Sequence, residues 1–372
     1  MDAYLDHAAT SPLRTEARDA MLPWLGERFG NPSGAHATAR AARQAIDEAR
    51  DDVACALGCE PGEVVFVSGG TEADNTALVG GVRARPGRVV VSAIEHHAVL
   101  DPAQHLGATI APVDEHGVIH LDALADALDE SVTFVSVMGV NNEVGSIQPL
   151  AEIAALVRQK APEAQIHSDV VQTIPWLDVA AHAAAVDVLS VSAHKFGGPQ
   201  GVGVLVVRRG ASVAPLLVGG GQERDRRSGT HNVAGIVGAA AALVATTENR
   251  PDDVVAVADR RDRLVDTLVS RLDGITETVP REHKVAGSAH VCVEDVSSDG
   301  LLFLLDRGGV AASAASACAS GATQASHVLA AMGLASERAA GALRLTLGPT
   351  TTDAEIDHAL EVVIDAVARL RG

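Results

Sequence analysis

Val186-Asp187-Val188-Leu189-Ser190-Val191-Ser192-Ala193-His194-Lys195-Phe196-Gly197-Gly198-Pro199 sets an apolar run directly before a lysine and a glycine pair. The run predicts a buried strand over residues 186–191, with Lys195 just beyond its carboxyl end. Only three of the 29 Lys and Arg residues are lysines. Arg keeps its proton at useful pH, whereas a lysine amine can be neutralised and can attack a carbonyl. A lysine at this position therefore indicates chemistry, while Lys160 and Lys284 have polar neighbours and are expected on the surface.

Short apolar runs alternate with longer amphipathic runs between residues 64 and 207, which is typical of βαβ units and a mainly parallel sheet. The predicted strands are 64–67, 88–91, 133–137, 165–168, 186–191 and 203–207. Ligands of open α/β sheets lie beyond the carboxyl ends of the strands. The candidate site is therefore built from the segments that follow the strands, namely 68–71, 95–97, 141–143, 169–172 and 192–195.

The C-terminal third predicts a second, smaller domain. Residues 233–245 and 254–272 predict two helices, and the polar stretch 249–253 between them suggests the crossing into that domain. Strand-like runs follow near 290–293 and 343–347, and a final helix is expected over 353–370.

Composition excludes several classes of function. The chain has 372 residues, is 47% hydrophobic and carries a net charge of -19, which disfavours binding to nucleic acid or anionic lipid. The N-terminus does not resemble a secretory signal, and the apolar stretch 233–245 is too short to span a bilayer, so we expect a cytoplasmic enzyme. The four cysteines are too scattered for a disulfide framework. Cys55 and Cys59 are expected to be buried thiols, and no metal site is expected.

An anion site is predicted at Ser68-Gly69-Gly70-Thr71-Glu72-Ala73-Asp74-Asn75, which follows one strand and opens a helix. Backbone N–H groups and the helix dipole meet there. The segment lacks the glycine and lysine spacing of nucleotide loops, so a lone phosphate is the favoured guest. An ordinary strand-to-helix turn is the alternative.

Four other side chains could carry chemistry, each with a structural alternative. Asp169 could pair with a protonated ring nitrogen or cap a helix. His96 could stack on a planar cofactor or move a proton, or it could be a structural histidine, and the adjacent His97 makes it difficult to choose between the two histidines. Cys318 lies among small residues, which is typical of an accessible thiol. Arg344 interrupts an apolar run and needs an anion, either a substrate carboxylate or an internal partner.

Together these segments resemble the cysteine desulfurases of the NifS/IscS type, which are pyridoxal-phosphate enzymes of the class V aminotransferase family. The resemblance covers nearly the whole chain. It is carried by the ordered motifs Tyr4-Leu5-Asp6-His7-Ala8-Ala9-Thr10, Phe29-Gly30-Asn31-Pro32-Ser33, residues 68–75, Val140-Asn141-Asn142-Glu143-Val144-Gly145, the Lys195 segment, Arg227-Ser228-Gly229-Thr230 and Ser316-Ala317-Cys318.

The resemblance implies a fold-type-I α/β architecture, with helices on both faces of a mainly parallel sheet and a smaller α+β domain. It implies a large cofactor-binding domain over 13–248, and a small domain over 1–12 and 249–372 that carries the cysteine loop. Lys195 would hold pyridoxal 5'-phosphate covalently, Asp169 would pair with its ring nitrogen, His96 would stack on the ring and Gln172 would contact its phenolic oxygen. The phosphate would be held by Gly70, Thr71, Ser192, His194 and, from the second subunit of a homodimer, Thr230. Asn142 and Arg344 would hold the substrate carboxylate, with Asn31 nearby, and Asn142 would also contact the cofactor.

The activity that the resemblance implies is conversion of L-cysteine to L-alanine. Freed Lys195 would remove the α-proton, Cys318 would take the sulfur as a persulfide, and His96 would relay a proton to the substrate thiol. Sulfur would then pass to an acceptor protein. Ala193, Gln200, Ala315, Val170 and Val171 depart from common family residues, and the chain stops soon after its last helix, which weakens an assignment to iron–sulfur assembly.

Two other interpretations remain open. Another class V enzyme, such as a selenocysteine lyase, a carbon–sulfur lyase or an aminotransferase, could have the same scaffold with Cys318 incidental. A catalytically silent sulfur-relay or scaffold partner is the second. The sequence does not identify the acceptor, because iron–sulfur assembly, tRNA thiolation, thiocofactor synthesis and DNA sulfur modification use similar enzymes.

Overall fold

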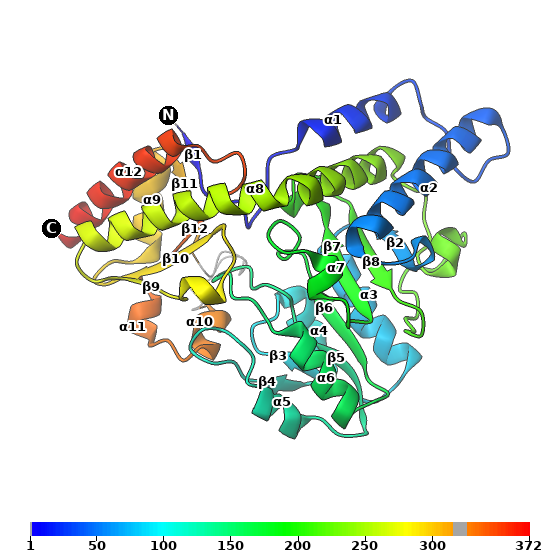
Figure 1. The fold of residues 1–372 in the computed structure, drawn as a ribbon, viewed down its shortest axis with the longest axis horizontal. Coiled ribbons are helices and arrows are strands. Elements are labelled where there is room, and N and C mark those ends of the chain that lie inside the picture. The colour runs from blue at the N-terminus through cyan, green and yellow to red at the C-terminus, as the bar shows by residue number, and fades with distance from the viewer. Residues whose placement is uncertain (1, 315–325) are drawn as a thin grey trace.

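A seven-stranded sheet forms the centre of the larger part of the molecule in the computed structural model, which describes residues 2–314 and 326–372 (Figure 1). All neighbouring strands are parallel except β8, which runs antiparallel to both β2 and β7. In spatial order the strands are β2 (Val64–Val67), β8 (Gly203–Val207), β7 (Val188–Ser192), β6 (Gln165–Asp169), β5 (Val132–Ser136), β3 (Arg88–Ser92) and β4 (Thr109–Ala111).

The prediction of a mainly parallel sheet is therefore confirmed, and the bounds of the expected strands differ from the observed ones by at most two residues. Strand β4 was missed because it has three residues and its central Ile110 is 39% exposed, so it lacks the apolar run that marked the others.

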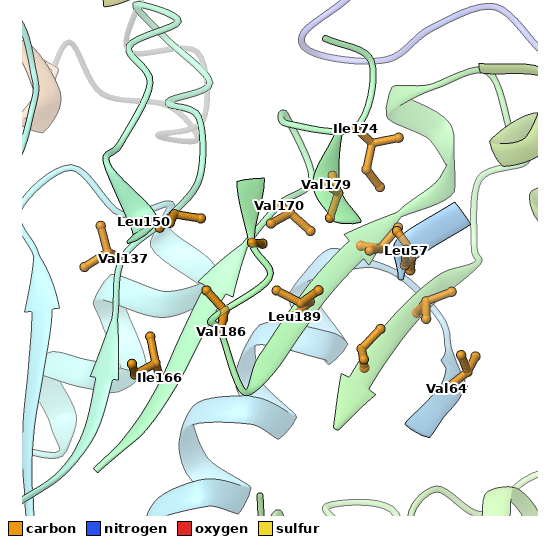
Figure 2. Close-up of a cluster of buried hydrophobic side chains, with 14 of the residues drawn as sticks. Leu57, Val64, Val137, Leu150, Ile166, Val170, Ile174, Val179, Val186 and Leu189 are labelled. Carbon is orange, nitrogen blue, oxygen red and sulfur yellow. The ribbon is translucent and has the colours of Figure 1, made fainter. Parts of the chain in front are cut away.

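Helices cover both faces of this sheet, as expected. Along β2, Val64 and Phe66 pack into one hydrophobic cluster and Val65 and Val67 into another, because successive strand residues point to opposite faces. Figure 2 shows part of the first cluster. The first face is covered by α2 (Ala37–Leu57), α5 (Leu121–Ala127), α6 (Leu150–Lys160), α7 (Val179–His182) and the start of α8 (Val233–Arg271), and the second by α3 (Gly70–Ala84) and α4 (His97–His105).

One long helix, α8, joins the two parts of the molecule (Figure 1). The prediction of separate helices over 233–245 and 254–272 was wrong, because α8 continues through Pro251. Its polar middle, residues 247–253, is mostly exposed between the two hydrophobic cores, so its polarity reflects solvent contact and not a chain break. The expected boundary at 248/249 falls inside this helix, and the division into domains stays a prediction.

The smaller part is built on a three-stranded antiparallel sheet. Strand β10 (Ser288–Val293) lies between β9 (Ile275–Glu277) and β12 (Ala342–Thr346). Helices α9 (Ser298–Arg307) and α12 (Asp353–Arg371) and the end of α8 pack against it in a second core. The other elements are β1 (Ala3–Tyr4), α1 (Thr15–Met21), β11 (Val310–Ala311), α10 (His327–Ala331), α11 (Ser336–Ala339) and the 3-10 turns η1 (Leu22–Leu25), η2 (Pro61–Glu63), η3 (Ala193–Lys195), η4 (Gln222–Asp225) and η5 (Arg281–His283).

The N-terminal segment connects both sheets at the site. Strand β1 pairs in parallel with β11, and the His7 N–H donates to the Thr346 carbonyl at 3.2 Å. Farther along, the Ser11 N–H donates to the His194 carbonyl at 2.8 Å. Residues 7–11 are thereby fixed between β12 and the turn that follows β7.

Two expectations about surface and core were wrong. Lys284 is buried and forms an ion pair with Glu277 of β9, a partner that its polar sequence neighbours did not reveal. Cys55 is exposed on the solvent side of α2, whereas Cys59 lies beyond the end of the helix at Leu57, where it is partly exposed and packs against the first hydrophobic cluster. Within the described ranges, no helix has the length and apolar composition needed to cross a bilayer.

Candidate active site

A cavity of about 320 Å³ lies where the loops after several strands meet β12 and the N-terminal segment. It contains residues that follow β2, β3, β5, β6 and β7, as the topology of a parallel sheet predicts. The sequence-predicted residues that line it are Gly70, Thr71, His96, Asn142, Asp169, Gln172, Ser192, His194, Lys195 and Arg344.

Lys195 reaches this cavity from the η3 turn. Its Nζ donates hydrogen bonds to the carbonyl oxygens of Ala8 at 2.7 Å and Ala9 at 2.8 Å, and Gln172 donates to the same Ala8 oxygen at 2.9 Å. The Ser11 hydroxyl donates to the Lys195 carbonyl at 3.0 Å. The N-terminal segment therefore orients the lysine amine from outside the sheet, a role for Ala8 and Ala9 that the sequence did not indicate.

Two buried carboxylates lie at the floor of the cavity. Asp169 is the last residue of β6, and burial raises its pKa to about 6, although the Val171 N–H and the charge of Lys195 lower it. Asp74 of α3 is 1% exposed, and burial, followed by repulsion from Asp169, raises its pKa. Within residues 2–314 and 326–372, Asp74 Oδ1 has no hydrogen-bond partner, and His167 Nε2 lies 3.6 Å from it.

Asp74 was not predicted as a site residue. Its signal was an acidic residue on the apolar side of α3, beside buried Ala73 and Ala77. Two adjacent carboxylates in a low-dielectric setting favour a cationic guest, because a positive charge would offset both their desolvation and their repulsion. A protonated ring nitrogen has that charge.

The structure separates His96 from His97. His96 lines the cavity, and its Nδ1 accepts the Ala98 N–H at 3.0 Å, which leaves the proton on Nε2. Burial and the nearby Lys195 charge lower its pKa to about 4, so its imidazole is neutral at pH 7. The His97 side chain is 43% exposed and contacts Asp101 at 3.0 Å. Of this pair, His96 has the position to contact a planar guest.

The opening of α3 fits a phosphate. This 15-residue helix begins at Gly70 with no side-chain cap. The N–H groups of its first turn are therefore available at the helix end that lines the cavity. A side chain at Gly203 would place its Cβ 2.7 Å from the Gly69 backbone, so the close approach of β8 to this turn requires glycine. Ser192 packs beside Gly70, and His194 Nδ1 contacts the Thr10 hydroxyl at 3.1 Å.

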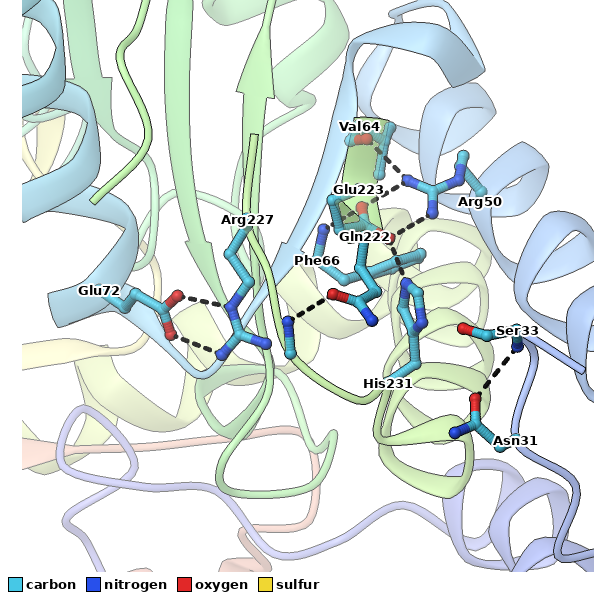
Figure 3. Close-up of polar contacts among 11 residues, drawn as sticks. Asn31, Ser33, Arg50, Val64, Phe66, Glu72, Gln222, Glu223, Arg227 and His231 are labelled. Carbon is cyan, nitrogen blue, oxygen red and sulfur yellow. Dashed lines mark hydrogen bonds and ion pairs between the residues drawn. The ribbon is translucent and has the colours of Figure 1, made fainter. Parts of the chain in front are cut away.

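The segment from Gln222 to His231 is held beside this turn by ion pairs (Figure 3). The Glu223 carboxylate is buried and accepts from Arg50, from His231 at 2.8 Å and from the Phe66 N–H at 2.9 Å. These donors lower its pKa to about 2, against the effect of burial. Arg227 pairs with Glu72 in the first turn of α3 at 2.8 Å.

Thr230 and Asn31 do not line the cavity within one chain. Thr230 lies on the exposed part of the segment just described, and Asn31 is also exposed, where its Oδ1 accepts the Ser33 N–H at 3.1 Å (Figure 3). The expectation that Thr230 serves a second subunit stays a prediction, as does the substrate contact of Asn31.

Arg344 lines the cavity from β12 and is 4% exposed. Its Nη2 pairs with Asp6 Oδ1 at 2.8 Å, and its Nη1 donates to the Asn142 carbonyl at 3.1 Å. The internal ion pair considered as an alternative from sequence is therefore present. A substrate carboxylate at Arg344 stays a prediction, and Asp6 is a site residue to which the sequence assigned no role.

Cys318 lies outside the described residues, but both flanks of its segment are described. The Ser313 backbone pairs with Arg344 in both directions, at 2.8 and 3.2 Å. At the other end, the Ser326 hydroxyl donates to Glu143 at 2.5 Å, and His327 Nε2 contacts the Glu95 carbonyl at 3.0 Å. The chain thus leaves and rejoins the described structure next to the cavity.

Two of the described cysteines have environments that oppose thiolate chemistry. Burial raises the pKa of Cys59 to about 11 and also raises the pKa of Cys292. A thiol with a raised pKa is mostly protonated at neutral pH, and the thiolate is the reactive form. Neither residue lines the cavity.

Glu95 provides a test of the electrostatics of this region. Its Oε1 accepts the Met138 N–H at 2.7 Å, and burial, reinforced by Asp169, raises its pKa to about 8. The folded protein then retains a proton that the unfolded chain loses near its ordinary pKa, so stability falls as pH rises through this window. Glu95→Gln should remove this dependence and stabilise the cofactor-free protein by about 2–4 kcal/mol more at about pH 9 than at about pH 5.

Urea unfolding of both proteins at the two pH values measures this difference. Glu361→Gln, at an exposed position of α12, is the matched control and should give equal changes at both. An equal effect of Glu95→Gln at both pH values would contradict the assignment of a buried, protonated carboxyl.

The donor set fits pyridoxal phosphate. Lys195 supplies an amine, Asp169 supplies a carboxyl group for a ring nitrogen with Asp74 beside it, and the uncapped start of α3 supplies N–H groups for phosphate. Within the described ranges, no group of three or more His, Cys, Asp or Glu side chains gathers as metal ligands.

Comparison with known proteins agrees with this geometry. The family model described as aminotransferase class-V matches residues 3–359. The IscS-like cysteine desulfurase of Mycobacterium tuberculosis is 42% identical over 384 residues, which cover 99% of this chain and 97% of that protein. Cysteine desulfurase IscS of Dictyoglomus turgidum is 37% identical over 378 residues, with 100% and 95% covered. A solved structure of a NifS-like protein has a TM-score of 0.93 at 35% identity and covers 99% of this chain and 100% of its own.

Proposed function

The chain belongs to the class V aminotransferase family, and from this premise we propose that it is a pyridoxal-phosphate-dependent cysteine desulfurase. It converts L-cysteine to L-alanine and passes the sulfur through Cys318 to an acceptor protein. The observation that carries the proposal is the convergence of Lys195, Asp169 and His96 on one cavity that also contains Arg344.

Different residues of the cavity bind different parts of the cofactor and substrate in this proposal. Gly70, Thr71, Ser192 and His194 hold the phosphate, Asp169 and Asp74 face the ring nitrogen, and Gln172 lies near the phenolic oxygen. Bound pyridoxal phosphate supplies an aldehyde that combines with amines and a ring that draws electrons from the substrate's α-carbon. Arg344 and Asn142 orient the substrate carboxylate.

Lys195 and His96 move the protons. Once its amine is released, Lys195 takes the α-proton, and the Ala8 and Ala9 carbonyls stabilise the ammonium that results. His96 is neutral, with its proton on Nε2, so it relays a proton to the substrate only after taking one from solvent, because loss of its single ring proton would leave an imidazolate.

Cys318 accepts the sulfur. Its thiolate attacks the sulfur of the substrate, an S–S bond forms, and the C–S bond breaks with its electron pair passing to the carbon fragment. That fragment is protonated and leaves as alanine, while the enzyme retains a persulfide. A soft, polarizable thiolate is suited to this attack, and a serine hydroxyl is not.

The proposal also covers the oligomeric state of the protein and the class of protein that accepts its sulfur. We infer a cytoplasmic homodimer in which Thr230 of one subunit reaches the phosphate of the other. The exposure of Thr230 and the ion pairs that hold its segment support this arrangement. Iron–sulfur scaffold proteins and tRNA-thiolation enzymes are the acceptor classes to test, and the names of the curated relatives support the first.

The proposal is tested by incubating the purified, cofactor-loaded protein with L-cysteine and a reductant. Alanine and sulfide should form in equal amounts. Pyruvate formation would instead identify a carbon–sulfur lyase, amino transfer to an added 2-oxo acid an aminotransferase, and a strong preference for selenocysteine a selenocysteine lyase. Absence of every reaction in loaded protein would favour a silent sulfur-relay partner.

A further inference from the structure

The ion pair between Asp6 and Arg344 uses Nη2, the guanidinium nitrogen that a bidentate carboxylate also needs. Asp6 Oδ1 lies 2.8 Å from Nη2, Nη1 donates to the Asn142 carbonyl, and Nε has no hydrogen-bond partner among the described residues. A carboxylate can bind an arginine through two parallel hydrogen bonds, either at Nε and Nη2 or at Nη1 and Nη2. Both arrangements use Nη2, each through one of its two N–H groups, so Asp6 occupies a donor of one arrangement and places its negative charge beside the other.

The backbone of Asp6 is firmly held. Its carbonyl accepts hydrogen bonds from the Ala9 N–H at 3.0 Å and the Tyr4 hydroxyl at 3.1 Å, and Asp6 forms a bridge with Thr346 of β12. The side chain is different, because it is 21% exposed, lines the cavity and contacts Arg344 through a single oxygen. Asp6 can therefore withdraw its carboxylate by side-chain rotation while its backbone remains in place.

We propose that Asp6 is an internal competitor for the substrate carboxylate. It holds Arg344 in place while the site is empty, and it competes with a substrate carboxylate for the N–H groups of Nη2. The inference rests on the proposed function for the identity of that carboxylate. Since alanine has the same carboxylate as cysteine, Asp6 also promotes product release, and its effect is to raise both the KM for cysteine and the inhibition constant for alanine.

The test removes the charge of Asp6 and keeps its shape. Asp6→Asn is compared with the wild-type holoenzyme by calorimetric titration with two probes. The first, 3-mercaptopropionate, is cysteine without its amino group, and the second, cysteamine, is cysteine without its carboxylate. We expect 3-mercaptopropionate to bind roughly tenfold more tightly to the variant, because a smaller fraction of the molecules has Arg344 paired with residue 6. The affinity for cysteamine should not increase.

Controls separate competition from other effects of the substitution. Asp19→Asn removes the charge of an exposed aspartate that pairs with Arg18, and it should change neither affinity. In an Arg344→Ala background, Asp6→Asn should no longer increase the affinity for 3-mercaptopropionate. Thermal unfolding checks that each variant folds, and Asp6→Ala serves if the asparagine variant does not.

Weaker or unchanged binding of 3-mercaptopropionate by a folded Asp6 variant would overturn the inference, because Asp6 would then only position Arg344. Equal gains in affinity for both probes would also overturn it. The titration does not depend on turnover. If the wild-type protein forms no alanine from cysteine while Asp6→Asn binds the carboxylate probe more tightly, the proposed function fails and the competition stands.

Discussion

Replacing Lys195 with alanine is expected to reduce alanine formation from cysteine by at least about 10³-fold, because the substitution removes the amine that holds the cofactor and accepts the α-proton. The purified variant should also lose the visible absorbance that a cofactor bound to lysine gives. Product analysis and an absorption spectrum of the same preparation measure both effects. Lys160→Ala, at an exposed position near the end of α6, is the matched control and should retain both properties.

Lys195→Arg makes this prediction sharper. Arginine keeps the positive charge beside Ala8, Ala9 and Asp169, but it neither condenses with an aldehyde nor gives up its proton at useful pH. The arginine variant should therefore be as inactive as the alanine variant. Substantial turnover in either of them would show that the lysine amine is not the catalytic base.

Cys318→Ser has the second large expected effect. We expect formation of the enzyme-bound persulfide to be abolished and alanine formation to fall by roughly 10³-fold, because a hydroxyl cannot accept the substrate's sulfur. The visible absorbance should remain, since Lys195 and Asp169 are untouched. Mass spectrometry of the protein after exposure to cysteine, together with alanine analysis, measures these outcomes.

Cys55→Ser is the matched control for the thiol, because Cys55 is exposed on α2 and does not line the cavity. It should retain the persulfide and full activity. Undiminished alanine and sulfide formation by Cys318→Ser in the presence of a reductant would refute the persulfide step and favour a lyase in which the cysteine is incidental.

The parts of the site that the sequence could predict are those that follow strands. Asp169 ends a strand, Lys195 and His96 lie within four residues of the end of one, and parallel strands bring such positions to one edge of a sheet. Their convergence therefore followed from the strand pattern together with the order of the motifs. The same pattern located the glycine turn at Gly70, because a strand that leads into a helix is a local feature.

The parts that could not be predicted depend on contacts between distant segments. Asp6 meets Arg344, and the Ala8 and Ala9 carbonyls meet Lys195, only because the N-terminal segment lies between the two sheets. Lys284 is buried because Glu277 of a neighbouring strand pairs with it. A local window also could not distinguish the exposed middle of α8 from a loop, since both are polar.

The most direct test of the account is to reduce the cofactor-loaded protein with borohydride, digest it and identify the lysine that carries the cofactor by mass spectrometry. The chain has three lysines, so each possible site can be resolved. We expect the modification on the peptide that contains Lys195 and on no other. Modification of Lys160 or Lys284 in its place, or loaded protein with no modified lysine, would contradict it.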